Sequence, residues 1–459
     1  MEIQRFKAKG LAQLSYLVSS KNEAFVVDPQ LDCEQYLSAA AENNVTIKFV
    51  IETHRNEDFI SGAAVLGKQL NIPVYHGQHS DAPIEYAESV EEGDTFKVGE
   101  LKVAILETPG HTKDSICITV ADTSISDEVI AIFTGDTLFV NDVGRTDFYP
   151  DEKEQITATL YESLQKLNAL PEETVVYPAH GAGSVCGGGM ADREFSTLGY
   201  EKRHNPKWSL SSKEQFVKEK LNETHYYAPY FEKMERLNSQ GHYDCIVHRD
   251  IPALSARDVT EIARQADSGQ LQIVDVRNKD AFCQSHIRGS LFFGAGLTSA
   301  YGGWFLKDDV DIVIVSPDAN TAKQNAIQLK CMGYEKIKGY LVELPVRTGD
   351  STVDEGLNAI EIVTAKQVDE RATQSQQKWS LLDVRKQDER DKAAIEGSDY
   401  IYLGYLPDKL SELDKERHYT CYCGSGVRAT TAASFLAQQG IENVDVMEGS
   451  MKAWKKLKG

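Results

Sequence analysis

The segment Phe49-Val-Ile-Glu-Thr-His-Arg-Asn-Glu-Asp-Phe-Ile-Ser-Gly62 decides the fold of the first half of the chain, because it joins an apolar run to His54 and Asp58. Short apolar runs bounded by Gly, Pro or polar residues predict buried strands. Three later runs, at 102–106, 129–133 and 174–177, lead in the same way to His111, Asp136 and His180. Side chains just past strand ends predict an α/β domain with its functional site at that sheet edge.

The stretches between these runs complete the α/β pattern. Residues 60–70 and 154–167 have amphipathic spacing and are predicted to be helices, and residues 24–28 form a further apolar run. With 459 residues, the chain is long enough for two or three domains. We expect the first domain to cover residues 1–240.

Charge and composition exclude several kinds of partner. The formal net charge is −21 and no basic stretch is present, so nucleic acid is not expected as a partner. No run approaches the ~18 apolar residues of a membrane span, and the first residues lack a secretory signal, so we expect a cytoplasmic protein without membrane attachment. Eight cysteines in such a chain predict free thiols and not a disulfide framework.

The second half of the chain contains a repeat. Ile273-Val-Asp-Val-Arg277 recurs as Leu381-Leu-Asp-Val-Arg385, at an offset of 108 residues. A later Gly pair keeps nearly the same offset, which predicts a duplicated domain of about 100 residues. We expect the two copies at 253–350 and 357–459.

The motifs of the first domain resemble those of the metallo-β-lactamase superfamily, which implies an αββα sandwich. They are Thr53-His-Arg-Asn-Glu-Asp-Phe-Ile-Ser-Gly62, Pro109-Gly-His-Thr112, Gly135-Asp-Thr-Leu-Phe139 and Ala179-His-Gly181. Asn56 and Phe59 stand where the family has histidines, so each zinc position of a binuclear hydrolase loses a ligand. His54, His111 and Asp136 remain as a metal set. It suits either Fe(II) with O2 or a single catalytic zinc ion.

Within this superfamily, the chain resembles the persulfide dioxygenases, and this resemblance implies one Fe(II) held by these three residues. It also implies that Asp58 and His180 are remnants of the second metal site that now make hydrogen bonds. Segments 144–147 and 198–203 resemble the family's substrate side, which makes Arg145, Tyr200 and Arg203 candidates for substrate binding or, alternatively, surface residues. Cys186 is a candidate sulfur carrier or a packed loop cysteine.

The last copy contains a candidate nucleophile. Cys423-Gly-Ser-Gly-Val-Arg428 follows an apolar run and precedes a predicted helix. Loop N–H groups, the helix dipole and Arg428 favour a thiolate at Cys423 and a bound anion, with Gly424 and Gly426 in the cradle. The segment resembles the active loop of rhodanese sulfurtransferases. Cys421 is expected to be inert. In the middle copy the repeat places Ser316 and Thr321 at the Cys and Arg positions, which predicts an inactive module.

The whole order resembles persulfide dioxygenase–rhodanese fusions, with two α/β rhodanese-like domains of parallel strands. It implies oxidation of a low-molecular-weight thiol persulfide by O2 to sulfite, and formation of thiosulfate through Cys423 in sulfide detoxification. Three alternatives stay open: a zinc thioester hydrolase of the glyoxalase II type, a sulfur carrier or redox sensor, and sulfur flow in the reverse direction. The spare middle module favours a homo-oligomer, either a dimer or a tetramer.

Overall fold

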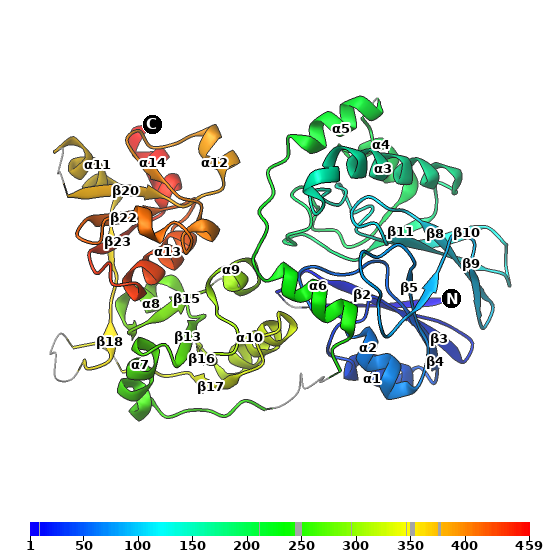
Figure 1. The fold of residues 1–459 in the computed structure, drawn as a ribbon, viewed down its shortest axis with the longest axis horizontal. Coiled ribbons are helices and arrows are strands. Elements are labelled where there is room, and N and C mark those ends of the chain that lie inside the picture. The colour runs from blue at the N-terminus through cyan, green and yellow to red at the C-terminus, as the bar shows by residue number, and fades with distance from the viewer. Residues whose placement is uncertain are drawn as a thin grey trace. The chain divides into compact units, whose positions relative to one another are not determined.

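The computed structural model describes residues 1–8, 10–210, 212–243, 250–294, 296–345, 347–348, 354–374 and 378–459. They form two compact units, Met1–His248 with Cys331–Gly333, and Arg249–Lys330 with Tyr334–Gly459 (Figure 1). The predicted end of the middle domain at residue 350 lies outside the described residues, so the domain boundaries stay a prediction. No described helix has both the length and the apolar character needed to cross a membrane.

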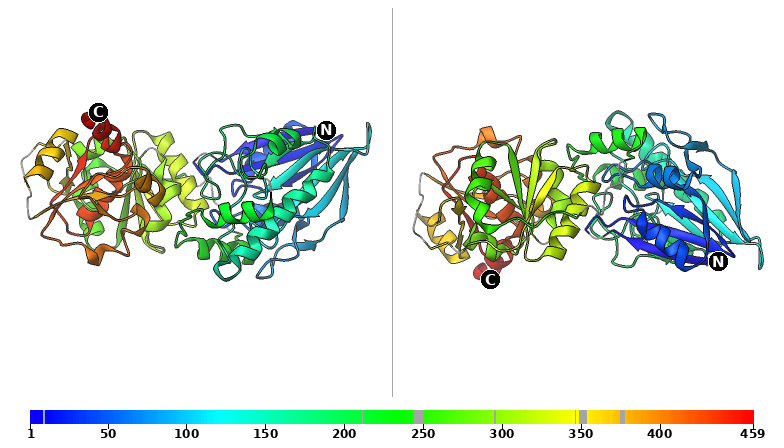
Figure 2. Two further views of the ribbon diagram at one scale, coloured as in Figure 1. Left: turned by 90° about the horizontal axis from the view of Figure 1, so that it is seen from above. Right: turned by 90° about the horizontal axis from the view of Figure 1, so that it is seen from below.

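Two six-stranded sheets form the centre of the first unit. The first has the order β1 (Glu2–Lys7), β2 (Leu14–Ser20), β3 (Glu23–Val27), β4 (Thr46–Ile51), β5 (Val74–Gly77), β6 (Glu88–Val90). The second has the order β12 (Ser196–Thr197), β11 (Val175–Pro178), β10 (Val129–Gly135), β9 (Ile116–Asp122), β8 (Leu101–Glu107), β7 (Thr95–Val98). Figure 2 shows their blue and cyan strands as two layers.

Apolar side chains from both sheets meet in one core. The rings of Phe25 on β3 and Phe133 on β10 lie 6.5 Å apart between the layers. Helices α1 (Glu34–Glu42) and α2 (Ala63–Leu70) pack on the first sheet, and α3 (Lys153–Lys166) and α5 (Lys213–Leu221) cover the second. The unit also contains α4 (Leu198–His204) and α6 (Phe231–Gln240). The predicted αββα sandwich is confirmed.

Strand direction brings the predicted site residues together. β8 and β10 are both antiparallel to β9, and β10 is parallel to β11, so β8, β10 and β11 end at the same edge. His111, Asp136 and His180 follow these three ends. His54 follows β4 of the facing sheet.

The second unit contains both repeat copies. The middle copy has a sheet in the order β15 (Ser290–Phe292), β13 (Leu271–Asp275), β16 (Asp311–Val315), β17 (Ile337–Leu341). The last copy has the order β19 (Glu361–Val363), β23 (Val444–Met447), β22 (His418–Tyr422), β20 (Trp379–Asp383), β21 (Asp399–Tyr400). β14 (His286–Ile287) and β18 (Leu357–Asn358) form a separate pair. All strands within the two larger sheets are parallel, as predicted.

Helices pack around these sheets. In the middle copy they are α7 (Val259–Asp267), α8 (Lys279–Gln284), α9 (Leu297–Phe305) and α10 (Ala319–Cys331). In the last copy they are α11 (Ala365–Thr373), α12 (Gln387–Lys392), α13 (Val427–Gln438) and α14 (Ser450–Lys458).

The repeated Asp-Val-Arg segment has the same structure in both copies. At the end of β13 the Arg277 guanidinium donates to Asp275 Oδ2 at 2.6 Å and to the Ser285 carbonyl at 2.7 Å. At the end of β20, Arg385 donates to Asp383 Oδ2 at 2.7 Å and to the Ala393 carbonyl at 2.8 Å. A buried carboxylate requires such a partner, so this ion pair explains why both residues recur.

Gly110 allows α3 to reach the loop that carries His111. Its φ is +142°, and a Cβ there would lie 2.4 Å from the Cα of Leu160 on α3. Backbone therefore packs against backbone at this point, which only glycine permits. Ser163 of the same helix donates to the Pro109 carbonyl at 2.7 Å.

We expect Gly110→Ala to lower the free energy of unfolding by about 3 kcal/mol, because the new methyl group must displace α3 and strain the backbone. Thermal melting and metal content measured on the same samples test this. Gly188→Ala is the matched control, since nothing lies within 4 Å of its added Cβ. A Gly110→Ala protein that melts and binds metal like the wild type would contradict the packing argument.

Candidate metal centre and sulfur-transfer loop

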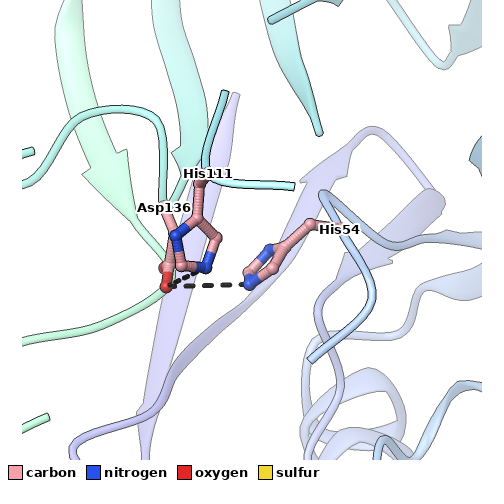
Figure 3. Close-up of side chains that lie close together, drawn as sticks. All are labelled: His54, His111 and Asp136. Atoms are coloured by element: carbon pink, nitrogen blue, oxygen red, sulfur yellow. Dashed lines mark ion pairs between the residues drawn. The ribbon is translucent and has the colours of Figure 1, made fainter. Parts of the chain in front are cut away.

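His54, His111 and Asp136 converge on one point (Figure 3). Asp136 Oδ2 lies 3.7 Å from His54 Nε2 and 3.3 Å from His111 Nε2. All three residues are buried, and none of these three atoms makes a hydrogen bond with any described residue. Buried polar atoms are rarely left without a partner. The unsatisfied set of two imidazole nitrogens and one carboxylate oxygen therefore fits a metal ion.

The tautomer of His54 is fixed by its neighbours. Asp28 accepts hydrogen bonds from the Thr53 amide at 2.7 Å and from the Thr53 hydroxyl at 2.8 Å. The Thr53 hydroxyl therefore has only its lone pairs left for His54 Nδ1, which lies 2.9 Å away. His54 carries its proton on Nδ1, and the lone pair of Nε2 faces the metal position.

His111 is prepared in the same manner. Its Nδ1 donates to the carbonyl oxygen of Arg145 at 2.9 Å, which leaves Nε2 free for a metal. Burial, only partly opposed by Asp136, lowers the pKa of His111 to about 4. The ring is thus neutral at physiological pH. Burial disfavours the charged carboxylate of Asp136, but the charge and the hydrogen bond of His180 outweigh burial and hold the pKa of Asp136 well below its usual range.

A second group of possible ligands lies beside the first and consists of Asp58, His180 and Cys186. His180 Nδ1 bonds to Asp136 Oδ1 at 2.7 Å, and its Nε2 lies 3.5 Å from Asp58 Oδ2. Burial opposes charge on His180, but the two carboxylates raise its pKa well above the ordinary value. Phe59 occupies a neighbouring position, with its ring 5.6 Å from that of His180.

The pKa of the Cys186 thiol is shifted in the direction opposite to that of a reactive cysteine. Burial, followed by the charges of Asp58 and Asp136, raises the pKa of its thiol well above the usual range. Its backbone carbonyl accepts a hydrogen bond from the Arg145 amide at 3.1 Å. Its role as a sulfur carrier stays a prediction.

Glu57 faces the metal position, although the sequence reasoning did not select it. Its Oε2 lies 4.0 Å from His111 Nε2, and neither of its buried carboxyl oxygens makes a hydrogen bond with a described residue. Burial, partly opposed by Arg55, raises the pKa of Glu57 well above the usual value. Its place in the first motif, between His54 and Asp58, is the signal that could have identified it.

A buried ion pair between His76 and Asp114 holds the backbone of the loop at residues 54–58. Asp114 accepts from His76 Nε2 at 2.5 Å and from the Arg55 amide at 2.9 Å, and His76 Nδ1 lies 3.3 Å from Glu52. Burial disfavours the charged ring, but hydrogen bonds with Asp114 and Glu52 outweigh burial and raise the pKa of His76 to about 10.

The three predicted substrate residues, Arg145, Tyr200 and Arg203, differ from one another in burial and in partners. The Arg145 side chain is buried, and its guanidinium forms a two-point contact with Asp147 at 2.6 and 2.7 Å. Tyr200 is 43% exposed on α4, and Arg203 pairs with Glu172 at 2.5 Å on the surface. No contact between Tyr200 or Arg203 and the metal residues is recorded within the described part of the chain. Substrate binding by all three stays a prediction.

Glu201 is a polar residue of α4 that faces the interior. It is fully buried and accepts hydrogen bonds from the Asn141 amide at 2.8 Å and from Asn205 Nδ2 at 3.1 Å. It therefore anchors the loop that follows Asp136.

The Cys423 loop sits at the start of α13. The Gly426 amide donates to Cys423 Sγ at 3.2 Å, and the Cys423 amide donates to Ser450 Oγ at 3.1 Å. Amides at the start of α14 donate to the carbonyls of Cys423 and Gly424 at 3.0 and 3.2 Å, which fixes the loop from its outer side. Arg428 contacts Glu389 through two hydrogen bonds of 2.6 and 2.7 Å.

In the equivalent loop of the middle copy, the Asp318 side chain fills the position at the helix N-terminus. Asp318 accepts from the Thr321 amide at 2.8 Å and from the Thr321 hydroxyl at 2.7 Å. Its carboxylate occupies the N-terminal end of α10, where an anion would otherwise bind. Ser316 donates to the Asp318 carbonyl at 2.9 Å and replaces the thiol.

In the last copy, burial raises the pKa of Cys421, which fits its predicted inertness.

Comparisons with known proteins agree with this architecture. The model for the metallo-beta-lactamase superfamily matches residues 8–180, and the model for the rhodanese-like domain matches residues 258–341 and 364–457. A crystal structure of a metallo-beta-lactamase from Staphylococcus aureus subsp. aureus COL is 28% identical, with a TM-score of 0.66, and covers 74% of this chain and 98% of its own.

Two kinds of curated relatives match part of the chain. A hydroxyacylglutathione hydrolase of Prochlorococcus marinus is 32% identical over 162 residues, which are 34% of this chain and 60% of the hydrolase. The mitochondrial persulfide dioxygenase ETHE1 of Bos taurus is 30% identical over 230 residues, which are 48% of this chain and 80% of the dioxygenase. The fold and these matches define a metallo-β-lactamase domain followed by rhodanese-like domains. The chain belongs to the persulfide dioxygenase family of the metallo-β-lactamase superfamily, and its first domain is fused to two rhodanese-like domains.

We expect His111→Ala to abolish metal binding, whereas His180→Ala retains one metal ion with an affinity about 10–100-fold lower, because His180 only orients Asp136. Metal analysis after desalting, followed by competition with a chelator, measures both effects. Wild-type protein with two metal ions, falling to one in His180→Ala, would instead make His180 a ligand.

We expect His76→Gln to destabilise the fold in a pH-dependent manner. The folded pKa of about 10 exceeds the ordinary 6.5, so the stabilisation is fully present below pH 6.5 and is lost as the pH rises through 10. Breaking this buried pair costs about 3–5 kcal/mol near neutral pH. The difference in Tm from the wild type should therefore shrink between pH 7 and 10. His79→Gln, at a largely exposed histidine, is the control, and a pH-independent difference would contradict the argument.

Proposed function

We propose that the chain is a non-haem Fe(II) persulfide dioxygenase coupled to a rhodanese sulfurtransferase. The observation that carries the proposal is the buried set of His54, His111 and Asp136, whose three ligand atoms face one point and make no hydrogen bond with a described residue. Two imidazoles and one carboxylate with open positions suit Fe(II), which would supply O2 activation. The persulfide dioxygenase relatives support the same reaction.

The proposed first reaction is balanced. A persulfide RSS⁻, O2 and water give the thiol RSH, sulfite and one proton, with both oxygen atoms of O2 on the outer sulfur. The surrounding residues exclude bulk water, since His54, Glu57 and His111 are all buried. We propose that Arg145 contributes through its carbonyl, which orients His111, because Asp147 already engages its guanidinium.

The second reaction occurs at Cys423. Sulfite attacks the outer sulfur of a Cys423 persulfide, the S–S bond breaks, and thiosulfate leaves while the thiolate is regenerated. The Gly426 amide at the N-terminus of α13 donates to Cys423 Sγ at 3.2 Å and so contacts the sulfur that leaves. Joining both reactions in one chain raises the effective concentration of sulfite at the second site.

A zinc-dependent thioester hydrolase is the second candidate. It is favoured by the 32% identity to a hydroxyacylglutathione hydrolase and by the neighbouring Asp58, His180 and Cys186 group. The chain matches only 50–60% of the length of three hydroxyacylglutathione hydrolases to which it is similar. A hydrolase needs zinc and no oxygen, so metal analysis and oxygen uptake separate the two functions.

We expect Fe(II)-loaded protein to consume O2 with at least one of the persulfides of glutathione, coenzyme A, bacillithiol or cysteine, and to form thiosulfate. His111→Ala should abolish the uptake, and Cys423→Ser should retain it while releasing sulfite. Cys421→Ser, two residues away on β22, is the matched control and should behave as the wild type. No uptake with any persulfide, together with tightly bound zinc, would overturn the proposal in favour of the hydrolase.

A further inference from the structure

The middle copy holds the helix that positions Cys423. The Phe292 amide of β15 donates to Ser434 Oγ at 3.1 Å, and Gln438 Nε2 donates to the Gly289 carbonyl at 2.9 Å. Ser434 and Gln438 both lie on α13. Figure 1 shows β15 and α8 of the middle copy beside this helix. The Cys423 loop is therefore supported by two copies and not by its own alone.

The first residue of α8, Lys279, lies next to the Cys423 loop. A Cβ placed on Gly426 would be 3.6 Å from Lys279 Cδ and 3.9 Å from its Cε. The amide of the same Gly426 donates to Cys423 Sγ. The Lys279 ammonium pairs with Asp280 at 2.9 Å, but Asp280 is 81% exposed, and such surface pairs are weak. The ammonium can therefore turn to a bound anion at little cost.

The last copy alone provides little net positive charge. Both terminal nitrogens of Arg428 donate to the carboxylate of Glu389, at 2.6 and 2.7 Å, so much of its charge is already neutralised. The N-terminus of α13 contributes about half an elementary charge. Thiosulfate is a dianion at neutral pH and sulfite carries between one and two negative charges, so Lys279 adds positive charge that Arg428, already paired with Glu389, supplies only in part.

A second residue of the middle copy reaches Arg428 from α9. The Trp304 ring packs so closely on Gly404 that a Cβ there would lie 2.9 Å from it, which fixes α9 against the last copy. Tyr301, one turn earlier, is 5% exposed. Burial raises the pKa of Tyr301, while the charge of Arg428 and hydrogen bonds with Tyr402 and Arg428 oppose the rise. The Tyr301 ring lies 6.3 Å from the ring of Tyr402 in the last copy, so the phenol faces the copy that carries Arg428.

We propose that Lys279 and Tyr301 of the inactive middle copy complete the Cys423 site for a sulfur oxyanion, either the sulfonate end of thiosulfate or sulfite. Lys279 binds the oxyanion, and Tyr301 is a positioning residue for Arg428. The proposal rests on the sulfurtransferase part of the proposed function. With thiosulfate as donor, the Cys423 thiolate attacks the outer sulfur, the S–S bond breaks, and sulfite leaves with the electron pair.

Sulfur transfer from thiosulfate to cyanide in the full-length protein tests this without involving the metal centre. Cyanide takes the outer sulfur of the Cys423 persulfide, giving thiocyanate and the free thiolate. We expect Lys279→Gln to raise KM for thiosulfate about tenfold with little change in kcat, because it removes one charged contact. Lys279→Arg should restore most of the affinity. Lys323→Gln, an exposed paired lysine on α10, is the control.

Tyr301→Phe should also raise KM for thiosulfate, by about three- to tenfold, and leave KM for cyanide unchanged. If Tyr301 acts through Arg428, the same substitution adds nothing in an Arg428→Lys background. Tyr334→Phe removes another buried phenol of the middle copy and is the control. Thermal melting of every variant reports whether the fold is intact.

The possible outcomes are distinguishable. Active wild-type protein with unchanged constants in Lys279→Gln and Tyr301→Phe would overturn this inference and leave the sulfurtransferase function standing. Additive effects of Tyr301→Phe and Arg428→Lys would overturn the positioning role. Wild-type protein without any thiosulfate-to-cyanide transfer would overturn both the inference and the sulfurtransferase function.

Discussion

The first unit depends on a buried negative charge, the carboxylate of Asp136, and on the imidazoles around it. One oxygen faces His54 and His111, and the other accepts a hydrogen bond from His180 at 2.7 Å. An isolated carboxylate in a protein interior is strongly destabilising, so the chain must deliver all its partners to one point. The αββα sandwich does this because three strands of one sheet and one strand of the other end at the same edge.

The loop around the metal position extends this constraint. Residues 54–58 are all buried, and several of their polar atoms have no hydrogen-bond partner among the described residues. Such atoms are tolerated where a ligand, water or metal completes them. The His76–Asp114 pair holds the loop backbone through the Arg55 amide. The His76–Asp114 pair thus fixes the backbone of residues 54–58, and the polar side-chain atoms of these residues that lack hydrogen bonds form a polar site that a bound ligand or metal can complete.

Sequence reasoning succeeded where one short signal decides the structure. The strands β3, β4, β8, β10 and β11 are mostly apolar runs, and the ends of β4, β8 and β10 pointed to His54, His111 and Asp136, which the structure brings together. The edge strand β1 was not predicted, since its pattern is partly exposed along its whole length. On α4, the sequence could not tell which face is buried: Tyr200 was selected and is 43% exposed, whereas Glu201 is 0% exposed. Only the loop that covers the helix decides this.

The two repeat copies show how one scaffold gains or loses an anion site. Both keep the strand-end pair of Asp and Arg, and both place a helix after the central strand. In the middle copy the Asp318 carboxylate caps that helix, so the positive end of the dipole is already used. In the last copy Gly426, with a φ of +109°, caps it without a side chain and leaves its amide to Cys423. The two copies therefore differ in the group that occupies one helix N-terminus, and the middle copy, where Asp318 fills that position, still packs against α13 of the last copy.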